Sequence, residues 1–189
     1  MIYPVTYLGP VSWYRSWLRD ANAAIEQYET YTKQTIRNHC QIVGPNGIQT
    51  LTIPVERMHD NKIMTRNIRI INQNNWQHIH WQALRTAYRN SPFYDYYIDL
   101  FEPFYTKQYD FLFDFNIEIM QVVLKLLEIK KEIKLTDDFE ADRQHFFTTQ
   151  TDNTTIPYYQ VFESRHGFMP DMSIIDLLFN MGPESYKIL

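Results

Sequence analysis

The sequence predicts a mixed α and β fold: N-terminal strands and a hairpin, a central helical segment and a C-terminal capped helix. Two β-prone runs, residues 34–43 and 48–55, flank a turn that contains glycine and asparagine. Further along, apolar residues recur at the three- and four-residue spacing of an amphipathic helix. A chain of 189 residues can bury one full core and is short for two, so we expect a single domain over residues 1–189.

The composition is that of a globular protein with a well-filled interior. Hydrophobic residues make up 44% of the chain and charged residues 21%, which excludes a disordered chain. Aromatic residues reach 16% while only 5 glycines occur. Large planar side chains with few flexible joints are therefore expected to fill the core.

The first half of the chain is expected to consist of strands and turns around one short helix. Residues 2–8 are β-prone and end at a Gly-Pro turn, after which residues 11–18 carry apolar side chains at helical spacing. In the hairpin, the Asn-Gly pair that ends at Gly47 supplies the positive φ of a tight turn. A further strand is predicted at residues 67–71.

Three helices are predicted in the middle of the chain. One apolar stripe, which includes Ile79 and His80, predicts a helix over residues 76–90. A second helix is predicted at residues 93–101, ended by the proline that follows, and a third at residues 116–128.

The last part of the chain begins with a polar segment. Residues 136–157 are predicted to form a long irregular loop and residues 158–163 a strand. The final helix has clear end signals, with Ser173 as N-cap, Asp176 three residues later as in a capping box, and Gly182 as the stop. The capping box explains both polar side chains, so we interpret them as structural.

Charge and composition exclude several classes of partner. The net charge is −4 and charges of both signs are interspersed, so a nucleic-acid partner is not expected. The longest apolar stretch is interrupted by polar residues, and no export signal is seen, so we expect a cytoplasmic protein without a membrane span. Cys40 is the single cysteine, and its place in a β-prone run predicts a buried, unreactive thiol.

The sequence lacks the common catalytic and cofactor motifs. The signatures of α/β-hydrolases, dinucleotide-binding folds, nucleotide-binding loops and zinc proteases are all missing. His78 and His80 point to different sides of the predicted helix and cannot share a metal ion, so neither a metal nor a cofactor is expected. His80 lies on the apolar stripe, where a histidine is more often a satisfied core residue than a catalyst.

One polar run offers hydrogen-bond donors to a ligand. Lys33, Arg37, Asn38 and His39 lie in the first β-prone run or just before it. On an extended strand Arg37 and His39 share one face and Asn38 lies on the other, and such donors suit a carboxylate, a phosphate or a sugar hydroxyl. An exposed polar strand face is an equally good interpretation of the spacing.

Several segments together form a pattern that extends over nearly the whole chain. It comprises residues 32–42 with the hairpin turn, and the closing residues 168–182 with Tyr159 and Gln160 ahead of them. Between these segments the pattern continues with Trp76, His80, Tyr88, Pro92, Phe93 and Asn116. Taken in order, these residues resemble the WbqC-like protein family, which is named after a gene of bacterial O-antigen clusters.

This resemblance implies a bacterial acyl- or aminoacyl-transferase that acts on an amino sugar in surface polysaccharide biosynthesis. The expected partner is a small-molecule substrate, and His80 is the expected general base. The expected substrate-binding residues are Lys33, Arg37, Asn38, Tyr159 and Gln160. The alternative is a non-catalytic small-molecule-binding or structural protein in which these side chains belong to the core or to a polar rim.

The enzyme hypothesis requires Arg37, Asn38 and His80 to converge on one pocket. The helix over residues 76–90 must pack its apolar stripe on a sheet, and the hairpin is the nearest sheet in sequence. Because Arg37 and Asn38 point to opposite faces of an ideal strand, both reach one site only where the strand bends or ends.

Overall fold

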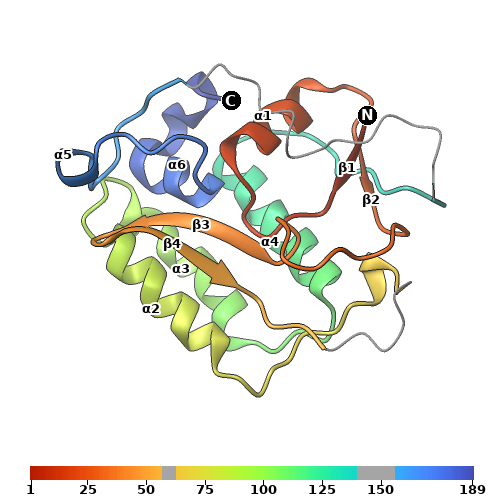
Figure 1. Ribbon diagram of the computed structural model, residues 1–189. Helices are drawn as coiled ribbons and strands as arrows, with labels where there is room; N and C mark the ends of the chain where they lie inside the picture. Colours follow the sequence, from red (N-terminus) through yellow and green to blue (C-terminus); the bar gives the residue numbers. More distant parts are fainter. Residues whose placement is uncertain (57–62, 140–155) are drawn as a thin grey trace.

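A computed structural model describes residues 1–56, 63–139 and 156–189, and two small sheets and a set of helices make up this part of the chain (Figure 1). In chain order the elements are β1 (Ile2–Pro4), α1 (Val11–Arg19), β2 (Ala24–Glu26), β3 (His39–Gly44), β4 (Gly47–Thr52), the 3-10 helix η1 (Thr65–Asn67), α2 (Trp76–Tyr88), α3 (Tyr94–Thr106), α4 (Leu112–Leu126), α5 (Glu163–His166), α6 (Ile174–Met181) and the 3-10 helix η2 (Gly182–Lys187). The predicted mixed α and β class is confirmed.

The predicted hairpin forms, but its first strand is shorter than expected. Strands β3 and β4 pair in antiparallel register, and the positive φ of the turn falls on Gly47, at 103°. Residues 36–38 form a turn instead of extended strand, closed by the Asn38 N–H donating to the Thr35 carbonyl at 3.1 Å. The turn also brings Asn38 Nδ2 to the Ile53 carbonyl, to which it donates at 3.1 Å. The expected alternation of Arg37, Asn38 and His39 along one strand was therefore wrong.

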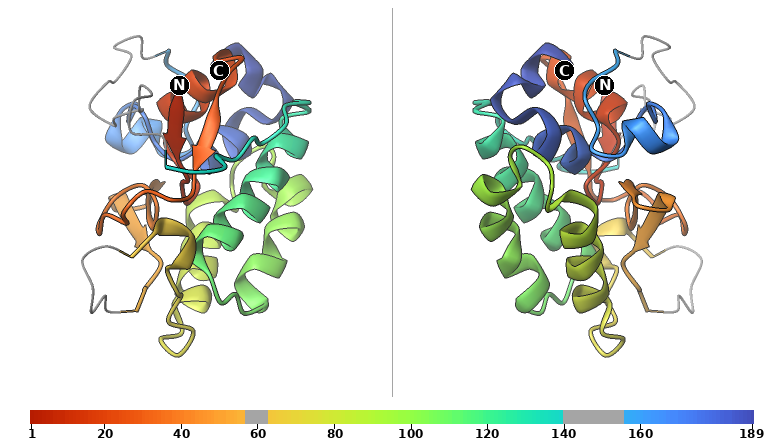
Figure 2. Two further views of the ribbon diagram at one scale, coloured as in Figure 1. Left: turned by 90° about the vertical axis from the view of Figure 1, so that its right-hand side faces the viewer. Right: turned by 90° about the vertical axis from the view of Figure 1, so that its left-hand side faces the viewer.

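Helices α2, α3 and α4 lie side by side as a layer, with the hairpin against α2 (Figure 2). All three predicted helices exist, with shifted ends. Helix α3 continues through Pro103 to Thr106 because Phe104 and Tyr105 are buried, and this packing outweighs the local cost of proline. Helix α4 begins at Leu112, earlier than predicted, because its first turn packs into the core. Ile79 was expected on the buried face of α2 and is 55% exposed.

The N-terminal segment differs from the predicted single strand. Strand β1 ends at Pro4 and pairs in parallel with β2, which was not predicted. Beyond β1 the chain turns, with Leu8 at a φ of 44°, and the Tyr7 N–H donates to the Ile36 carbonyl at 2.9 Å. Helix α1 follows as predicted. The turn at Leu8 lies against the start of α6, where the Ile174 N–H donates to the Gly9 carbonyl at 2.8 Å.

Two further strand predictions were wrong. Residues 67–71 end a 3-10 helix and then make isolated bridges, Arg69 with Phe111 and Ile70 with Val55. Residues 158–163 include no strand and lead into the short helix α5. At residues 67–71 the backbone pairs with single residues of two other segments instead of forming a ladder. Residues 140–155, most of the predicted polar loop, lie outside the described residues.

Helix α6 begins at the predicted N-cap, but only half of the capping box forms. The Ser173 hydroxyl accepts from the Ile175 N–H at 3.3 Å and donates to the Leu8 carbonyl at 2.6 Å. Asp176 does not reach back to Ser173; it is buried and accepts from the Tyr158 hydroxyl and from Gln160 Nε2. Gly182 ends the helix with a φ of 53°, and a Cβ on it would collide with the Phe93 ring.

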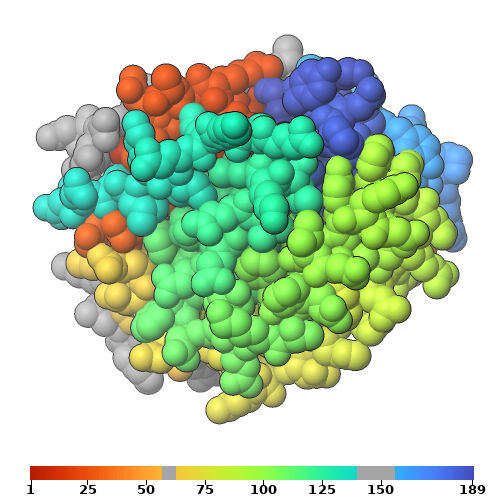
Figure 3. Space-filling view, turned by 180° about the vertical axis from the view of Figure 1, so that it is seen from behind, coloured from red at the N-terminus to blue at the C-terminus, as the bar shows by residue number. Residues whose placement is uncertain are grey.

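Seen from behind, the molecule is covered mainly by α3, α4 and the segment that follows α4 (Figure 3). The N-terminal and C-terminal segments meet along one edge of this face (Figure 3). Arg15 Nε donates to the Ile188 carbonyl at 2.9 Å and Arg19 Nε to the Leu189 carbonyl at 3.1 Å. Helix α1 thus ties the two ends of the chain together.

We predict that Ser173→Ala lowers the free energy of unfolding by about 2 kcal/mol, because it removes a helix cap and leaves the buried Leu8 carbonyl without a donor. Urea unfolding followed by tryptophan fluorescence measures this. The matched control is Ser164→Ala on the exposed part of α5, which should change stability by less than about 0.5 kcal/mol. Equal effects of the two changes would contradict the structural role of Ser173.

Candidate functional site

His80 lies within the core on helix α2. Its side chain is 3% exposed, and Nδ1 is 2.9 Å from the Tyr7 hydroxyl, which in turn is 2.9 Å from the Tyr105 hydroxyl. The Trp76 ring meets the imidazole edge-on at 5.1 Å between centroids. Burial lowers the pKa of His80 to about 4, and a hydrogen bond with the backbone of Thr52 partly opposes this. His80 is thus a neutral, hydrogen-bonded core residue.

Arg37 and Asn38 are engaged with other parts of the protein. The Arg37 guanidinium makes a two-pronged ion pair with Glu29, with Nε and Nη2 at 2.7 and 2.6 Å from the two carboxylate oxygens. The backbone carbonyl of Arg37 accepts a hydrogen bond from Asn116 Nδ2 at 2.7 Å. Asn38 is buried, and its Nδ2 donates to the Ile53 carbonyl at 3.1 Å. These contacts fasten the turn before β3 to α4 and to the residue after β4.

The remaining predicted binding residues lie apart from these. Lys33 is exposed in the loop before β3, and Tyr159 is 52% exposed near α5. Gln160 is buried, donating to Asp176 Oδ2 and to the Met169 carbonyl, both at 2.9 Å. The roles of these residues in substrate binding stay predictions.

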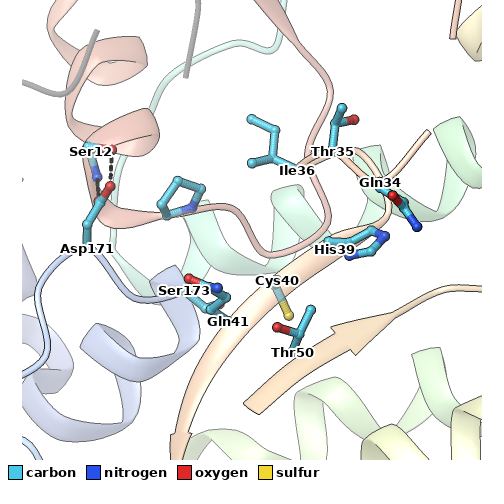
Figure 4. A pocket seen from close by; sticks show the side chains of 11 residues that line it. Ser12, Gln34, Thr35, Ile36, His39, Cys40, Gln41, Thr50, Asp171 and Ser173 are labelled. Carbon is cyan, nitrogen blue, oxygen red and sulfur yellow. Dashed lines mark hydrogen bonds between the residues drawn. The ribbon is translucent and has the colours of Figure 1, made fainter. Parts of the chain in front are cut away.

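A cavity of about 460 Å³ opens beside the hairpin (Figure 4). It lies between β3, the start of α1, the loop before β3 and the segment that precedes α6 (Figures 1 and 4). The lining residues are Pro10, Ser12, Gln34, Thr35, Ile36, His39, Cys40, Gln41, Thr50, Asp171 and Ser173. Arg37, Asn38 and His80 are not among them, so the three residues expected to share a pocket do not meet in this cavity.

The start of helix α1 forms one end of the cavity. Its N-cap residue, Pro10, has no side-chain acceptor. Asp171 supplies one instead: Oδ1 accepts from the Ser12 N–H and Oδ2 from the Ser12 hydroxyl, each at 2.8 Å (Figure 4). The Val11 N–H donates to the Met172 carbonyl at 3.0 Å. The first N–H groups of α1 are therefore already satisfied and are not open to an anionic ligand.

His39, the first residue of β3, is the one histidine in the cavity lining. Its Nδ1 is 3.3 Å from the Thr52 hydroxyl, and Nε2 is buried with no hydrogen-bond partner. Partial burial lowers the pKa of His39 below its usual value, so the ring is neutral at pH 7. In the tautomer that carries its proton on Nδ1 and donates it to the Thr52 hydroxyl, Nε2 has a lone pair that is able to accept a proton.

Cys40 is buried, as predicted, on the inner side of β3. Burial raises the pKa of its thiol, and a hydrogen bond with the Ser173 side chain opposes this only in part. A thiol with a raised pKa is a poor nucleophile because little thiolate forms at neutral pH. We therefore assign Cys40 to the cavity wall and not to the chemistry.

Sequence reasoning missed Asp171 and Ser12 as parts of a site. One signal could have pointed to them: the helix predicted over residues 11–18 follows Pro10, which cannot cap it with a side chain. Such a helix needs a distant acceptor, but the sequence does not say which one. Asp171 lies 159 positions away, and only the folded chain identifies it.

The described residues contain neither a cluster of metal ligands nor a membrane-spanning helix. In residues 1–56, 63–139 and 156–189, no three histidine, cysteine or acidic side chains gather as they would around a metal ion. Within the same ranges, no helix combines the length and the apolar character that crossing a membrane requires.

The fold and the cavity define a class: a mixed α and β protein with a hairpin, a three-helix layer and a polar cavity beside the hairpin. The model of the WbqC-like protein family matches residues 22–152, which is more than half of the chain. The chain therefore belongs to the WbqC-like protein family. A curated relative is "Uncharacterized protein Rv1507c" of Mycobacterium tuberculosis (strain ATCC 25618 / H37Rv), 26% identical over 192 residues and covering 82% of this chain and 81% of its own. No solved structure matches the chain.

We predict that His80 makes the protein less stable in acid. Its pKa is lowered to about 4 in the folded state, so below about pH 6.5 the unfolded chain binds a proton that the folded chain does not, and stability falls as the pH falls. The free energy of unfolding should fall by about 2 kcal/mol between pH 7.5 and pH 5 because of His80. Urea unfolding at both pH values should show a smaller acid loss in His80→Gln than in the wild type.

His78→Gln is the matched control, because His78 lies two positions away on the exposed face of α2. This variant should retain the full acid loss of the wild type. An unchanged acid loss in His80→Gln would mean that His80 is not buried as a neutral imidazole.

We also predict that the Cys40 thiol of the native protein reacts with an aromatic disulfide reagent at least about 100-fold more slowly than in 6 M urea, because burial keeps it protonated and shielded. Absorbance of the released thiolate measures the rate. The Cys40→Ser variant sets the background. A fast native reaction would show that the thiol in the cavity wall is accessible and readily ionised.

Proposed function

We propose that this protein is an acyl- or aminoacyl-transferase that binds an amino sugar in the cavity beside the hairpin. The observation that supports this most is the lining itself. The cavity volume of about 460 Å³ suits a monosaccharide with part of a donor group, and amide, hydroxyl and imidazole side chains line it. Such groups match the hydrogen-bonding needs of a polyhydroxyl ligand.

The proposed general base is His39. General base catalysis needs a group that is unprotonated at working pH and within reach of the substrate proton. His39 lines the cavity with a neutral ring, and its buried, unpaired Nε2 comes within reach of a ligand when neighbouring side chains shift. His80, which the sequence suggested for this role, has Nδ1 engaged with Tyr7 and is shielded within the core. The geometry supports His39 over His80.

The proposed reaction balances with one co-reactant, an activated acyl donor such as a thioester. The amino group of the sugar enters as an ammonium ion and first loses one proton to water; the neutral amine then attacks the carbonyl carbon, and His39 Nε2 accepts the second proton. The bond between the carbonyl carbon and the sulfur then breaks, and the proton passes to the departing thiolate. The products are an amide and a free thiol.

The second candidate is a binding protein without catalysis. One observation favours it: Nε2 of His39 is buried, so a ligand must shift neighbouring side chains to reach it. In that case the cavity would hold the sugar by hydrogen bonds alone. The two candidates make different predictions for a variant that lacks the imidazole.

We predict that His39→Gln lowers the rate of acyl transfer at least about 100-fold while changing sugar affinity less than about threefold, because glutamine keeps hydrogen-bonding groups but is not a base. The probe pair is glucosamine with an acetyl or glycyl thioester, with the amide product measured by mass spectrometry. Affinity is measured separately by calorimetry. Wild-type binding without any product would favour the non-catalytic candidate.

The location of the site is tested with a matched pair of tryptophan substitutions on the hairpin. Gln41→Trp fills the cavity, whereas Gln49→Trp changes an exposed residue on the partner strand that is not part of the lining. Only Gln41→Trp should abolish sugar binding. Loss of binding in both, or in neither, would place the ligand elsewhere.

A further inference from the structure

We propose that Asp171 determines the specificity of the cavity by binding a positively charged amino group of the ligand. The inference rests on the proposed function, because it takes the cavity as the ligand site. It adds a residue to which the sequence analysis assigned no role in binding. Three features of the cavity support it: the charge of the lining, the unused acceptor sites of the carboxylate, and the fixed position of that carboxylate.

Asp171 is the one carboxylate in a lining that contains no lysine or arginine. The nearest arginine in sequence to the lining, Arg37, is already paired with Glu29. The N–H groups at the start of α1 are satisfied by Asp171 and by the Met172 carbonyl. A ligand with a phosphate or carboxylate at this end would therefore meet a like charge without a compensating donor, whereas an ammonium group would meet an opposite charge.

The Asp171 carboxylate retains capacity for a ligand. Each oxygen accepts one hydrogen bond, both from Ser12, at 2.8 Å. A carboxylate oxygen accepts about two hydrogen bonds, so each still has an acceptor site. An ammonium group offers three donors and no acceptor, which makes it complementary to these sites.

The carboxylate is also held in a fixed position. Asp171 has a φ of 56°, a left-handed conformation that aspartate adopts more readily than most residues. The two bonds with Ser12 fix the side chain, and the Ser173 N–H donates to the Gln41 carbonyl at 2.8 Å and fixes the backbone two residues on. A preorganised charge loses little freedom when it binds a ligand.

The competing interpretation is that Asp171 serves only as a remote cap of α1. The variant Asp171→Asn separates the two roles. Its Oδ1 still accepts from the Ser12 N–H, its amide still bonds the Ser12 hydroxyl, and asparagine tolerates the left-handed conformation. The cap is therefore kept while the charge is removed.

The experiment compares glucosamine, glucose and ethanolamine by calorimetry at about pH 6 and low salt, where the amines are charged. The wild type should bind glucosamine at least about tenfold more tightly than glucose, and added salt should reduce this difference. In Asp171→Asn the two sugars should bind equally, and the melting temperature should stay within about 2 °C of the wild type. Ethanolamine should compete with glucosamine only in the wild type.

The outcomes separate this inference from the proposed function. The role of Asp171 is overturned if the wild type binds both sugars equally, or if Asp171→Asn keeps the full preference for glucosamine. Neither result bears on the transferase proposal, which the His39→Gln experiment tests. A preference for glucosamine that depends on Asp171, found without any transfer product, supports the role of Asp171 and contradicts the proposed transferase activity. If none of the three compounds binds, the inference is overturned together with the cavity as a sugar site.

Discussion

The hydroxyl of Ser173 is the contact on which the arrangement around the cavity depends. It caps α6 through the Ile175 N–H and donates to the Leu8 carbonyl, while the backbone N–H of the same residue donates to the Gln41 carbonyl. One residue thus joins the start of the last helix, the N-terminal turn and the hairpin strand. These are the three segments that bring Asp171, Ser12 and His39 to one cavity. The cavity exists because they are held together at this point.

Buried polar side chains repeat this pattern elsewhere in the described part of the chain. Tyr7, His80 and Tyr105 form a hydrogen-bonded row inside an aromatic core, and Gln160 joins Asp176 to the Met169 carbonyl. Each such group would cost free energy if it were left unpaired, so each restricts how the segments around it pack. An aromatic interior with few small residues gains specificity from these bonds, because ring packing alone tolerates several arrangements.

The sequence predicted what depends on local pattern. The hairpin, helix α1, the three central helices and the N-cap at Ser173 follow from turn chemistry, periodicity and capping, and all of them form. The parallel pairing of β1 with β2 and the continuation of α3 through Pro103 depend on distant partners, which a local pattern does not encode. For the proposed site, the sequence pattern pointed to the polar run that contains His39 but gave no sign of Asp171 or Ser12. Arg37 and Asn38 looked available because their partners, Glu29 and the Ile53 carbonyl, are identified only by the folded chain.

The distance along the chain between the cavity walls has a consequence for biosynthesis. Ser173 and Leu8 are 165 positions apart, and Asp171 and Ser12 are 159 apart. A ribosome extends the chain from the N-terminus, so α1, the hairpin and the helix layer emerge before the segment that caps α1 and closes the cavity. Contacts of such long sequence separation form late and slow the final step of folding. During that interval the start of α1 and the outer side of β3 are exposed, and this is the stage at which a nascent chain would need protection by a chaperone.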